Sequence, residues 1–376
     1  MPGIVVTVLC LTTAGAGALA VAGAPRGNGP RGDGQRPAGA VTLVRAPDPS
    51  PETVTSTSPS NGTTGVAPDA SIVVAFSSPL RPVEPDPSVS PAVPGTWQVY
   101  NSTALVFTPA ASLVPSTTYT VTVPGGPLGV ASRDGQVLTP PVSLSFTIGT
   151  GSVLRLQQLL ATLGYLPLQF TGTVPRTRDM AIPQPGSFAW RSDSLPAQLT
   201  GQWSPTTLNP LTTGAIMAFE TENGLNVDGV VSAQVWSTLL ADVAVGKHNG
   251  EPVSYVLVTK TLPEHLTVWV NGVLTFANVP CNTGVAGAPT TDGTFAVFSH
   301  VQVSNMRGTD VTGTSYDVTV PWASYFNSGE ALHGYPRASY GYPQSNGCVE
   351  MPISTAGAVW PDTPIGTLVT VQGPTA

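Results

Sequence analysis

Ala331-Leu332-His333-Gly334, followed after ten residues by Ser345-Asn346-Gly347-Cys348-Val349-Glu350, is the stretch from which the fold and chemistry of this chain can be read. A free thiol is only about 3% ionised at neutral pH, so a nucleophilic cysteine needs a base beside it. His333 is suited to that role, and Gly347 lets the backbone turn sharply beside the thiol. This predicts a nucleophile–base pair of Cys348 and His333, while the spacing alone leaves open a buried structural cysteine.

The residues around this stretch predict a β-rich domain over residues 250–373. Strand-like runs cover residues 255–260, 266–270, 294–298 and 366–371, and Asn271-Gly272 before residues 273–276 is a strong hairpin signal. His333 stands before Gly334 in what we interpret as a loop. From Glu251 onward the chain has 8 acidic and 3 basic residues, so net charge does not attract an anionic polymer to this domain.

The segment resembles the catalytic domain of the L,D-transpeptidase (YkuD) family. The pattern of that family is a His-Gly, a spacer, then Ser/Thr-His-Gly-Cys. Further landmarks occur in the family's order: Asn282-Thr283-Gly284, Thr290-x-x-Gly293-x-Phe295, Val320-Pro-Trp322-x-x-Tyr325-Phe326 and Pro364-x-Gly366-Thr367-x-Val369. The resemblance implies that a thiolate attacks the peptide bond after the diamino acid of a tetrapeptide donor stem. D-Ala then leaves, and the amine of an acceptor stem resolves the thioester.

Carried over by position, the resemblance implies roles for five catalytic-loop residues. Cys348 is expected to be the nucleophile, His333 the base, and the Gly334 carbonyl the group that orients the imidazole. Ser345 and Gly347 are expected to shape the nucleophile loop, and the N–H groups of Gly347 and Cys348 are candidates for an oxyanion hole. Asn346, Arg337 and Tyr325 are candidate substrate contacts.

Two residues depart from the family pattern. Asn346 replaces a frequent His, which leaves His333 as the imidazole of the motif. Glu350 replaces a usual Arg that could bind a carboxylate, so recognition of the donor stem is open. Arg337 and Arg307 are substitutes by residue type, with surface or loop-anchoring arginines as the alternative. Cys281 is interpreted as structural.

Two further regions precede this domain. Strand-like runs at residues 71–76, 104–108, 118–123 and 143–148 predict a β-sandwich over residues 59–149 that resembles bacterial Ig-like domains. Residues 150–245 have a helical period and resemble a three-helix peptidoglycan-binding module with an insert at 171–210. Three helices are expected. The first carries Leu156 to Leu163, the second begins near Thr213, and the third begins after Ser232. The predicted fold class is therefore multidomain and mainly β.

The N-terminal residues predict export. Residues 1–24 read as a signal peptide, with a membrane anchor as the alternative, and residues 25–58 as a flexible linker. Cys10 reads as an ordinary apolar residue of this leader. Only 9% of the 376 residues are charged, and the net charge of −7 argues against a nucleic-acid partner. No metal-ligand motif or phosphate-binding loop is present, so no cofactor is expected.

These observations predict an exported, cell-wall-associated cysteine L,D-transpeptidase. Its partners would be peptidoglycan donor and acceptor stems, and carbapenem β-lactams would be acylating inhibitors. Two alternatives stay open. The same site could use water and act as an L,D-carboxypeptidase, or the domain could be a catalytically decayed wall-binding protein. A sortase is disfavoured, because Thr-Leu-x-Thr-Cys and a later Arg are missing.

Overall fold

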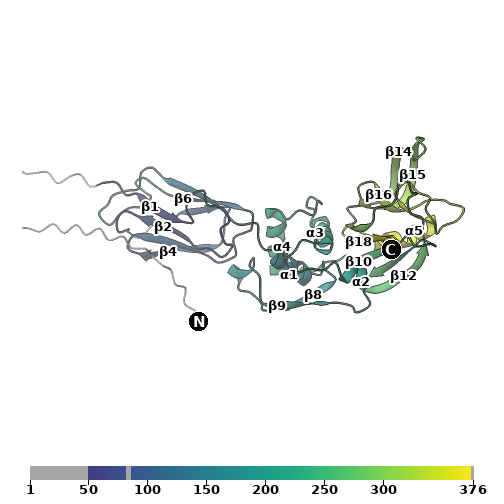
Figure 1. Cartoon of the computed structure of the whole chain (residues 1–376). Helices are drawn as coiled ribbons and strands as arrows, with labels where there is room; N and C mark the ends of the chain where they lie inside the picture. The colour runs from purple at the N-terminus through teal and green to yellow at the C-terminus, as the bar shows by residue number, and fades with distance from the viewer. Residues whose placement is uncertain (1–49, 82–85, 374–376) are drawn as a thin grey trace, which may run out of the picture. The chain divides into compact units, whose positions relative to one another are not determined.

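A computed structural model describes residues 50–81 and 86–373 of the chain. The predicted leader at residues 1–24, including Cys10, and most of the predicted linker lie outside the described residues. Along the described chain, a sandwich, a helical region and a C-terminal β-rich domain follow one another (Figure 1). Within the described part of the chain, no helix is long and apolar enough to cross a membrane.

The first region is a β-sandwich of two antiparallel sheets. One sheet has the order β1-β2-β5-β4 and the other β3-β6-β7. Alternating residues of β2, β5, β6 and β7 are buried and fill the space between the sheets, as period-2 patterning requires. The strands are β1 (Val54–Ser58), β2 (Ile72–Phe76), β3 (Ser88–Ser90), β4 (Gly95–Asn101), β5 (Ala104–Pro109), β6 (Thr118–Val123) and β7 (Val142–Thr147).

Strand β1 lies in the range that the sequence analysis gave to the flexible linker. It pairs with β2 through Ser56 to Ser58, and the buried carboxylate of Glu52 accepts hydrogen bonds from Ser77 and Ser78. The sequence analysis did not predict this strand because its residues are mostly Thr and Ser. An edge strand can satisfy its backbone hydrogen bonds in a sheet without burying an apolar face. The ordered sandwich therefore begins before residue 59.

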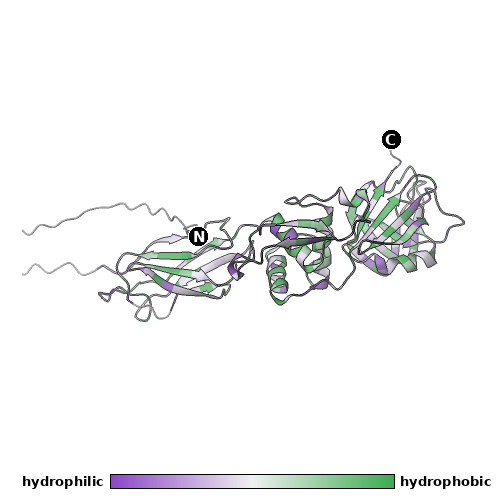
Figure 2. Cartoon of the chain, turned by 90° about the horizontal axis from the view of Figure 1, so that it is seen from below, coloured by the Kyte–Doolittle hydropathy of each residue, from purple (hydrophilic) through white to green (hydrophobic). Residues whose placement is uncertain are grey.

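The second region contains three main helices. They are α1 (Val153–Leu163), α3 (Pro210–Glu222) and α4 (Ala233–Val245), and their buried apolar side chains form one core. Figure 2 shows that hydrophobic and hydrophilic residues both occur along the helices. Ser152 and Ser232 cap α1 and α4, and Gly164 ends α1 in the left-handed region. Helix α3 begins three residues earlier than expected, because Asn209 caps it and Pro210 occupies its first turn.

The insert at 171–210 is ordered. It contributes to a hairpin of β8 (Leu168–Gly172) and β9 (Gly186–Trp190), and it contains the short helix α2 (Ala197–Thr200). Trp190 and Trp203 pack, partly buried, against the helical core. The buried Gln157 amide binds Ser204, Thr207 and Thr212, which fastens the insert to α1 and α3. Much of the aromatic surface of the insert is therefore buried in contacts with the core.

The third region has two sheets that enclose a separate core. One sheet has the order β12-β11-β10-β18-β13 and the other β14-β15-β16-β17. Between them lie apolar side chains and the fully buried Cys281. The strands are β10 (Ser254–Thr259), β11 (His265–Val270), β12 (Val273–Pro280), β13 (Gly293–Ala296), β14 (Ser299–Thr309), β15 (Ser315–Asn327), β16 (Glu330–Gly334), β17 (Val349–Met351) and β18 (Leu368–Gln372).

The predicted hairpin turn and the predicted loop at His333 can both be compared with the structure of this domain. The Asn271-Gly272 turn joins β11 to β12 with φ values of 51° and 79°, as a two-residue hairpin turn requires. His333 and Gly334, which we expected in a loop, instead lie on β16. That strand is only five residues long and is buried in the middle of its sheet, so it lacks the alternating pattern of a half-exposed strand.

Candidate active site

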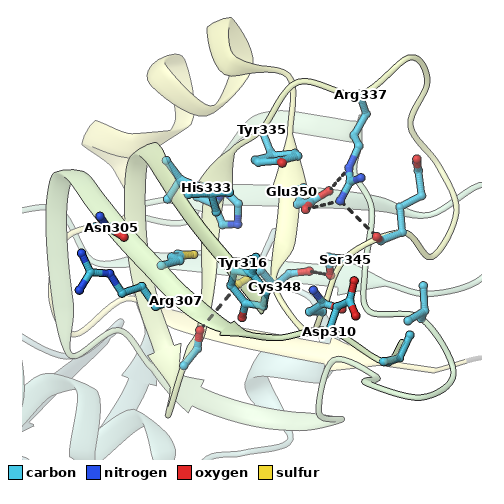
Figure 3. A pocket seen from close by; sticks show the side chains of 18 of the residues that line it. Asn305, Arg307, Asp310, Tyr316, His333, Tyr335, Arg337, Ser345, Cys348 and Glu350 are labelled. Carbon is cyan, nitrogen blue, oxygen red and sulfur yellow. Dashed lines mark hydrogen bonds and ion pairs between the residues drawn. The ribbon is translucent and has the colours of Figure 1, made fainter. Parts of the chain in front are cut away.

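The sheet register brings the two central residues of the motif together. Strands β16 and β17 are parallel neighbours, and His333 lies opposite Glu350. Cys348 directly precedes β17 and lies two residues before Glu350, so its side chain is on the same face of the sheet as that of His333. Both side chains line a hollow of about 570 Å³ that is bordered on another side by β14 and β15 (Figure 3). His333 is buried, and Cys348 is partly exposed.

The hydrogen bond of His333 fixes its tautomer. Its Nδ1 lies 3.0 Å from the carbonyl oxygen of Gly334, which can only accept, so Nδ1 carries the proton and Nε2 is free. Burial is the largest influence on its pKa, which is lowered below the ordinary value, although the Gly334 carbonyl and Glu350 act in the opposite direction. His333 is therefore a neutral imidazole near pH 7.

The thiol of Cys348 is also neutral in the free site. Burial raises its pKa to about 11, a hydrogen bond from the Ala331 backbone lowers it, and the charges of Glu350 and Glu330 raise it further. The Sγ atom lies 3.7 Å from the Gly329 carbonyl oxygen. The site therefore does not store a thiolate, and a reaction at this sulfur would need a base to take the thiol proton.

Ser345 and Gly347 hold the nucleophile loop. The Ser345 hydroxyl donates to the Cys348 carbonyl at 2.6 Å and accepts from the Gly347 N–H at 3.2 Å. Gly347 has a φ of 112°, a conformation that side chains rarely adopt, so glycine is required by the backbone. Because Ser345 engages the Gly347 N–H, that group is not free for an oxyanion hole, contrary to our expectation.

A support that sequence reasoning missed lies behind this loop. Glu264 is 1% exposed, and its two carboxylate oxygens accept hydrogen bonds from the N–H and hydroxyl of Thr283, each at 2.7 Å. The Thr283 carbonyl in turn accepts from the N–H groups of Gln344 and Ser345. Glu264 and Thr283 are far from Cys348 in sequence. The sequence analysis named only Thr283, as part of the Asn282-Thr283-Gly284 motif.

The predicted substrate contacts and the substitute arginines also line the hollow, and each has its own hydrogen-bond or ion-pair partners or is exposed. Arg337 binds Glu350 through two hydrogen bonds of 2.8 and 2.9 Å and also donates to the Gln344 carbonyl, so its guanidinium is engaged (Figure 3). Arg307 pairs with Asp317 on the exposed hairpin of β14 and β15. The Tyr325 hydroxyl lies 2.7 Å from Ser304 Oγ, and Asn346 is exposed at the rim.

The Arg337–Glu350 pair accounts for one departure from the family pattern. The carboxylate of Glu350 is almost fully buried and would be costly without a partner. Arg337 supplies that partner, and the attraction raises the pKa of its guanidinium. A basic group therefore still lies beside Glu350, the position two residues after Cys348 at which the family usually has Arg, although it comes from a different position in the chain.

Two regions of the sequence match known protein families. Residues 254–371 match the family model of the L,D-transpeptidase catalytic domain. The chain carries an L,D-transpeptidase catalytic domain. Residues 48–148 match the family model of a bacterial Ig-like domain. The peptidoglycan-binding resemblance of residues 150–245 has no such match and stays a prediction.

Solved L,D-transpeptidase structures are similar to this chain at low identity. The enzyme from Mycobacterium smegmatis is 14% identical, with 86% of this chain and 100% of that chain covered and a TM-score of 0.30. L,D-transpeptidase 3 from Mycobacterium tuberculosis is 16% identical, with 85% and 98% covered and a TM-score of 0.30. The catalytic domain of the E. faecium L,D-transpeptidase is 23% identical, with 32% and 96% covered and a TM-score of 0.29. A comparison with curated proteins gave no match.

Proposed function

We propose that the protein is an exported cysteine L,D-transpeptidase that cross-links peptidoglycan stem peptides. One observation carries the proposal: Cys348 and His333 line the same hollow, inside the residues that match the L,D-transpeptidase catalytic domain. The hollow lies between the nucleophile loop and the hairpin of β14 and β15, which leaves it open to a peptide.

The proposed reaction begins with proton transfer. The free Nε2 of His333 takes the thiol proton of Cys348 while the sulfur attacks the carbonyl carbon after the diamino acid of the donor stem. The tetrahedral intermediate collapses, the C–N bond breaks, and D-Ala leaves with the proton from His333. The Gly334 carbonyl keeps Nδ1 protonated throughout, so the imidazole returns to its starting state.

The remaining site residues are proposed to bind and position the donor stem. Ser345 and Gly347 hold the loop that presents Cys348. Asn346 and Tyr325 line the hollow and offer an amide and a phenol to a peptide backbone. Arg337 acts mainly through its contact with Glu350, with its remaining N–H groups as donors to a stem carboxylate.

A second candidate is an L,D-carboxypeptidase that uses the same acyl-enzyme. It is favoured by the partial exposure of Cys348, because water can reach the thioester carbon. A catalytically decayed wall-binding protein predicts instead that Cys348 is unreactive. The export signal at residues 1–24 and peptidoglycan binding by residues 150–245 belong to the leading proposal and would keep the enzyme at its polymeric substrate.

Product analysis separates these readings. The full chain is incubated with a disaccharide-tetrapeptide, and the products are identified by mass spectrometry. A transpeptidase releases D-Ala and forms cross-linked dimers, and Cys348→Ala does neither. Tripeptide without dimer would establish the carboxypeptidase, and equal activity of Cys348→Ala would refute the assignment of the nucleophile.

A further inference from the structure

Glu330, which the mechanism above does not use, is a fixed carboxylate beside the nucleophile loop. It is the first residue of β16. Its Oε1 accepts from the N–H and hydroxyl of Thr291 at 3.0 and 2.8 Å, and its Oε2 accepts from the Asn327 amide at 3.1 Å. A carboxylate can accept about four hydrogen bonds, so three donors hold it in place and leave capacity for one more.

Its position is close to the reacting sulfur. A Cβ atom placed on Gly347 would lie 3.8 Å from Glu330 Oε1. The carbonyl of the preceding residue, Gly329, is the group that Cys348 Sγ contacts, and Gly329 lines the catalytic hollow. The charge of Glu330 also opposes ionisation of the Cys348 thiol. The carboxylate is therefore within electrostatic reach of any group bound at the sulfur.

No cation neutralises Glu330 within the described residues. The catalytic domain has three basic residues, and each already pairs with another carboxylate: Lys260 with Asp292 at 2.7 Å, Arg307 with Asp317 at 3.0 Å, and Arg337 with Glu350 at 2.8 Å. Glu330 does not itself line the hollow, but an arriving cation finds an unneutralised carboxylate against Gly347, the residue before Cys348.

We propose that Glu330 binds the ammonium group of the acceptor stem and directs the acyl-enzyme towards transfer to an amine instead of water. The inference rests on the proposed function. A negative charge at this place opposes the thiolate of the first half-reaction, but the thioester that follows carries no charge on sulfur. In the second half-reaction the same charge favours the incoming cation, whereas it has no such effect on water.

The acceptor ammonium, held at Glu330, releases one proton to solvent. The neutral amine attacks the thioester carbonyl carbon, a C–N bond forms and the C–S bond breaks. A second proton passes from the nitrogen through His333 to the sulfur. The products are the cross-linked amide, the Cys348 thiol and one proton in solvent.

The test measures how the acyl-enzyme partitions in the full chain. Glu330→Gln keeps the shape and removes the charge, and Glu251→Gln makes the same change at an exposed site outside the hollow. The acceptors are the tetrapeptide stem, whose amine is charged, and hydroxylamine, which is uncharged near neutral pH. In Glu330→Gln the ratio of dimer to hydrolysed tripeptide should fall about tenfold, while transfer to hydroxylamine relative to hydrolysis changes less than about twofold. D-Ala release should quicken, because a charge that opposes the thiolate is gone.

Each other result has a distinct meaning. If the wild type releases no D-Ala, the proposed function fails and this inference fails with it. If the wild type releases D-Ala but the ratio of dimer to hydrolysed tripeptide is the same in wild type, Glu330→Gln and Glu251→Gln, the proposed function stands. Only the role of Glu330 in acceptor binding is then overturned. An equal fall for both acceptors would show a structural role for Glu330 and would also overturn it.

Discussion

At the scale of single residues, the catalytic pair combines a neutral thiol with a neutral imidazole. Burial raises the pKa of Cys348 to about 11 and lowers that of His333. In the proposed reaction the two groups therefore exchange a proton and do not start from a stored ion pair. This differs from sites in which a depressed cysteine pKa keeps the thiolate ready.

The first prediction concerns pH. Acylation of Cys348 requires neutral His333, so its rate should be constant above the pKa of His333 and fall on acidification with a midpoint below the ordinary value of about 6.5. The rate of carbapenem acylation, followed by mass spectrometry across pH, measures this. The ultraviolet absorbance of thiolate at neutral pH should be the same in wild type and Cys348→Ala. Excess thiolate in the wild type would contradict the neutral pair.

A second residue-scale prediction concerns Arg337 and Glu350. The side chain of Glu350 is 6% exposed, and removal of Arg337 leaves its charge unpaired, so Arg337→Ala should cost about 3 kcal/mol in the free energy of unfolding. A double-mutant cycle with Glu350→Ala should give a coupling energy above about 1 kcal/mol by urea unfolding. The matched control is the exposed Arg307–Asp317 pair, for which coupling should stay below about 0.5 kcal/mol. Equal couplings would show that burial does not strengthen the Arg337 pair.

At the scale of elements, local pattern predicted some strands and helices and missed others for physical reasons. The alternation of Tyr119, Val121 and Val123 and the cap Ser232 gave reliable signals, because one face of each element is buried. The long hairpin of β14 and β15 was missed. Many of its side chains are exposed, and Pro321 interrupts the pattern of β15. The link from Glu264 to the nucleophile loop joins distant segments, so no local pattern encodes it.

The β14–β15 hairpin supplies an element-scale prediction. His300 on β14 stacks on Trp360 at 3.9 Å between ring centroids, and its Nδ1 lies 3.1 Å from the Ser324 hydroxyl. Burial lowers its pKa to about 4, so the unfolded chain binds the proton more readily. Its contribution to stability is present above about pH 6.5 and is lost as the pH falls towards 4.

The size of this effect can be measured directly. Between about pH 7 and about pH 4.5, wild type should lose about 2 kcal/mol more of its free energy of unfolding than His300→Asn, as measured with urea. If both proteins lose the same amount, His300 does not titrate as described.

At the scale of the whole molecule, the helical region and the catalytic domain share a core. Tyr255 of β10 and Leu368 of β18 belong to the same apolar cluster as the three helices, whereas the sandwich has a cluster of its own. Gly214 of α3 and Gly366 pack closely, since a Cβ atom on Gly214 would lie 2.6 Å from the Gly366 carbonyl oxygen. The helical and catalytic regions should therefore unfold together.

Gly214→Ala tests this coupling by the sign of its effect. In an open helix this change stabilises by about 1 kcal/mol, but here the added methyl group meets backbone and should destabilise by about 1–3 kcal/mol. Calorimetry should show that the transition of the helical and catalytic regions moves down while that of the sandwich stays. Thr221→Ala, at an exposed position of the same helix, serves as the control and should not lower either transition. A stabilised Gly214→Ala would show that the two regions are not tightly packed.

The central claim is that Cys348 is a nucleophile that His333 activates. Intact-mass spectrometry of the full chain after exposure to a carbapenem tests it most directly. We predict one adduct on the wild type, none on Cys348→Ala, and acylation at least about a hundredfold slower in His333→Ala, because a general base contributes about that much or more. A wild-type chain that stays unmodified, or an adduct that persists in Cys348→Ala, would refute the roles of Cys348 and His333.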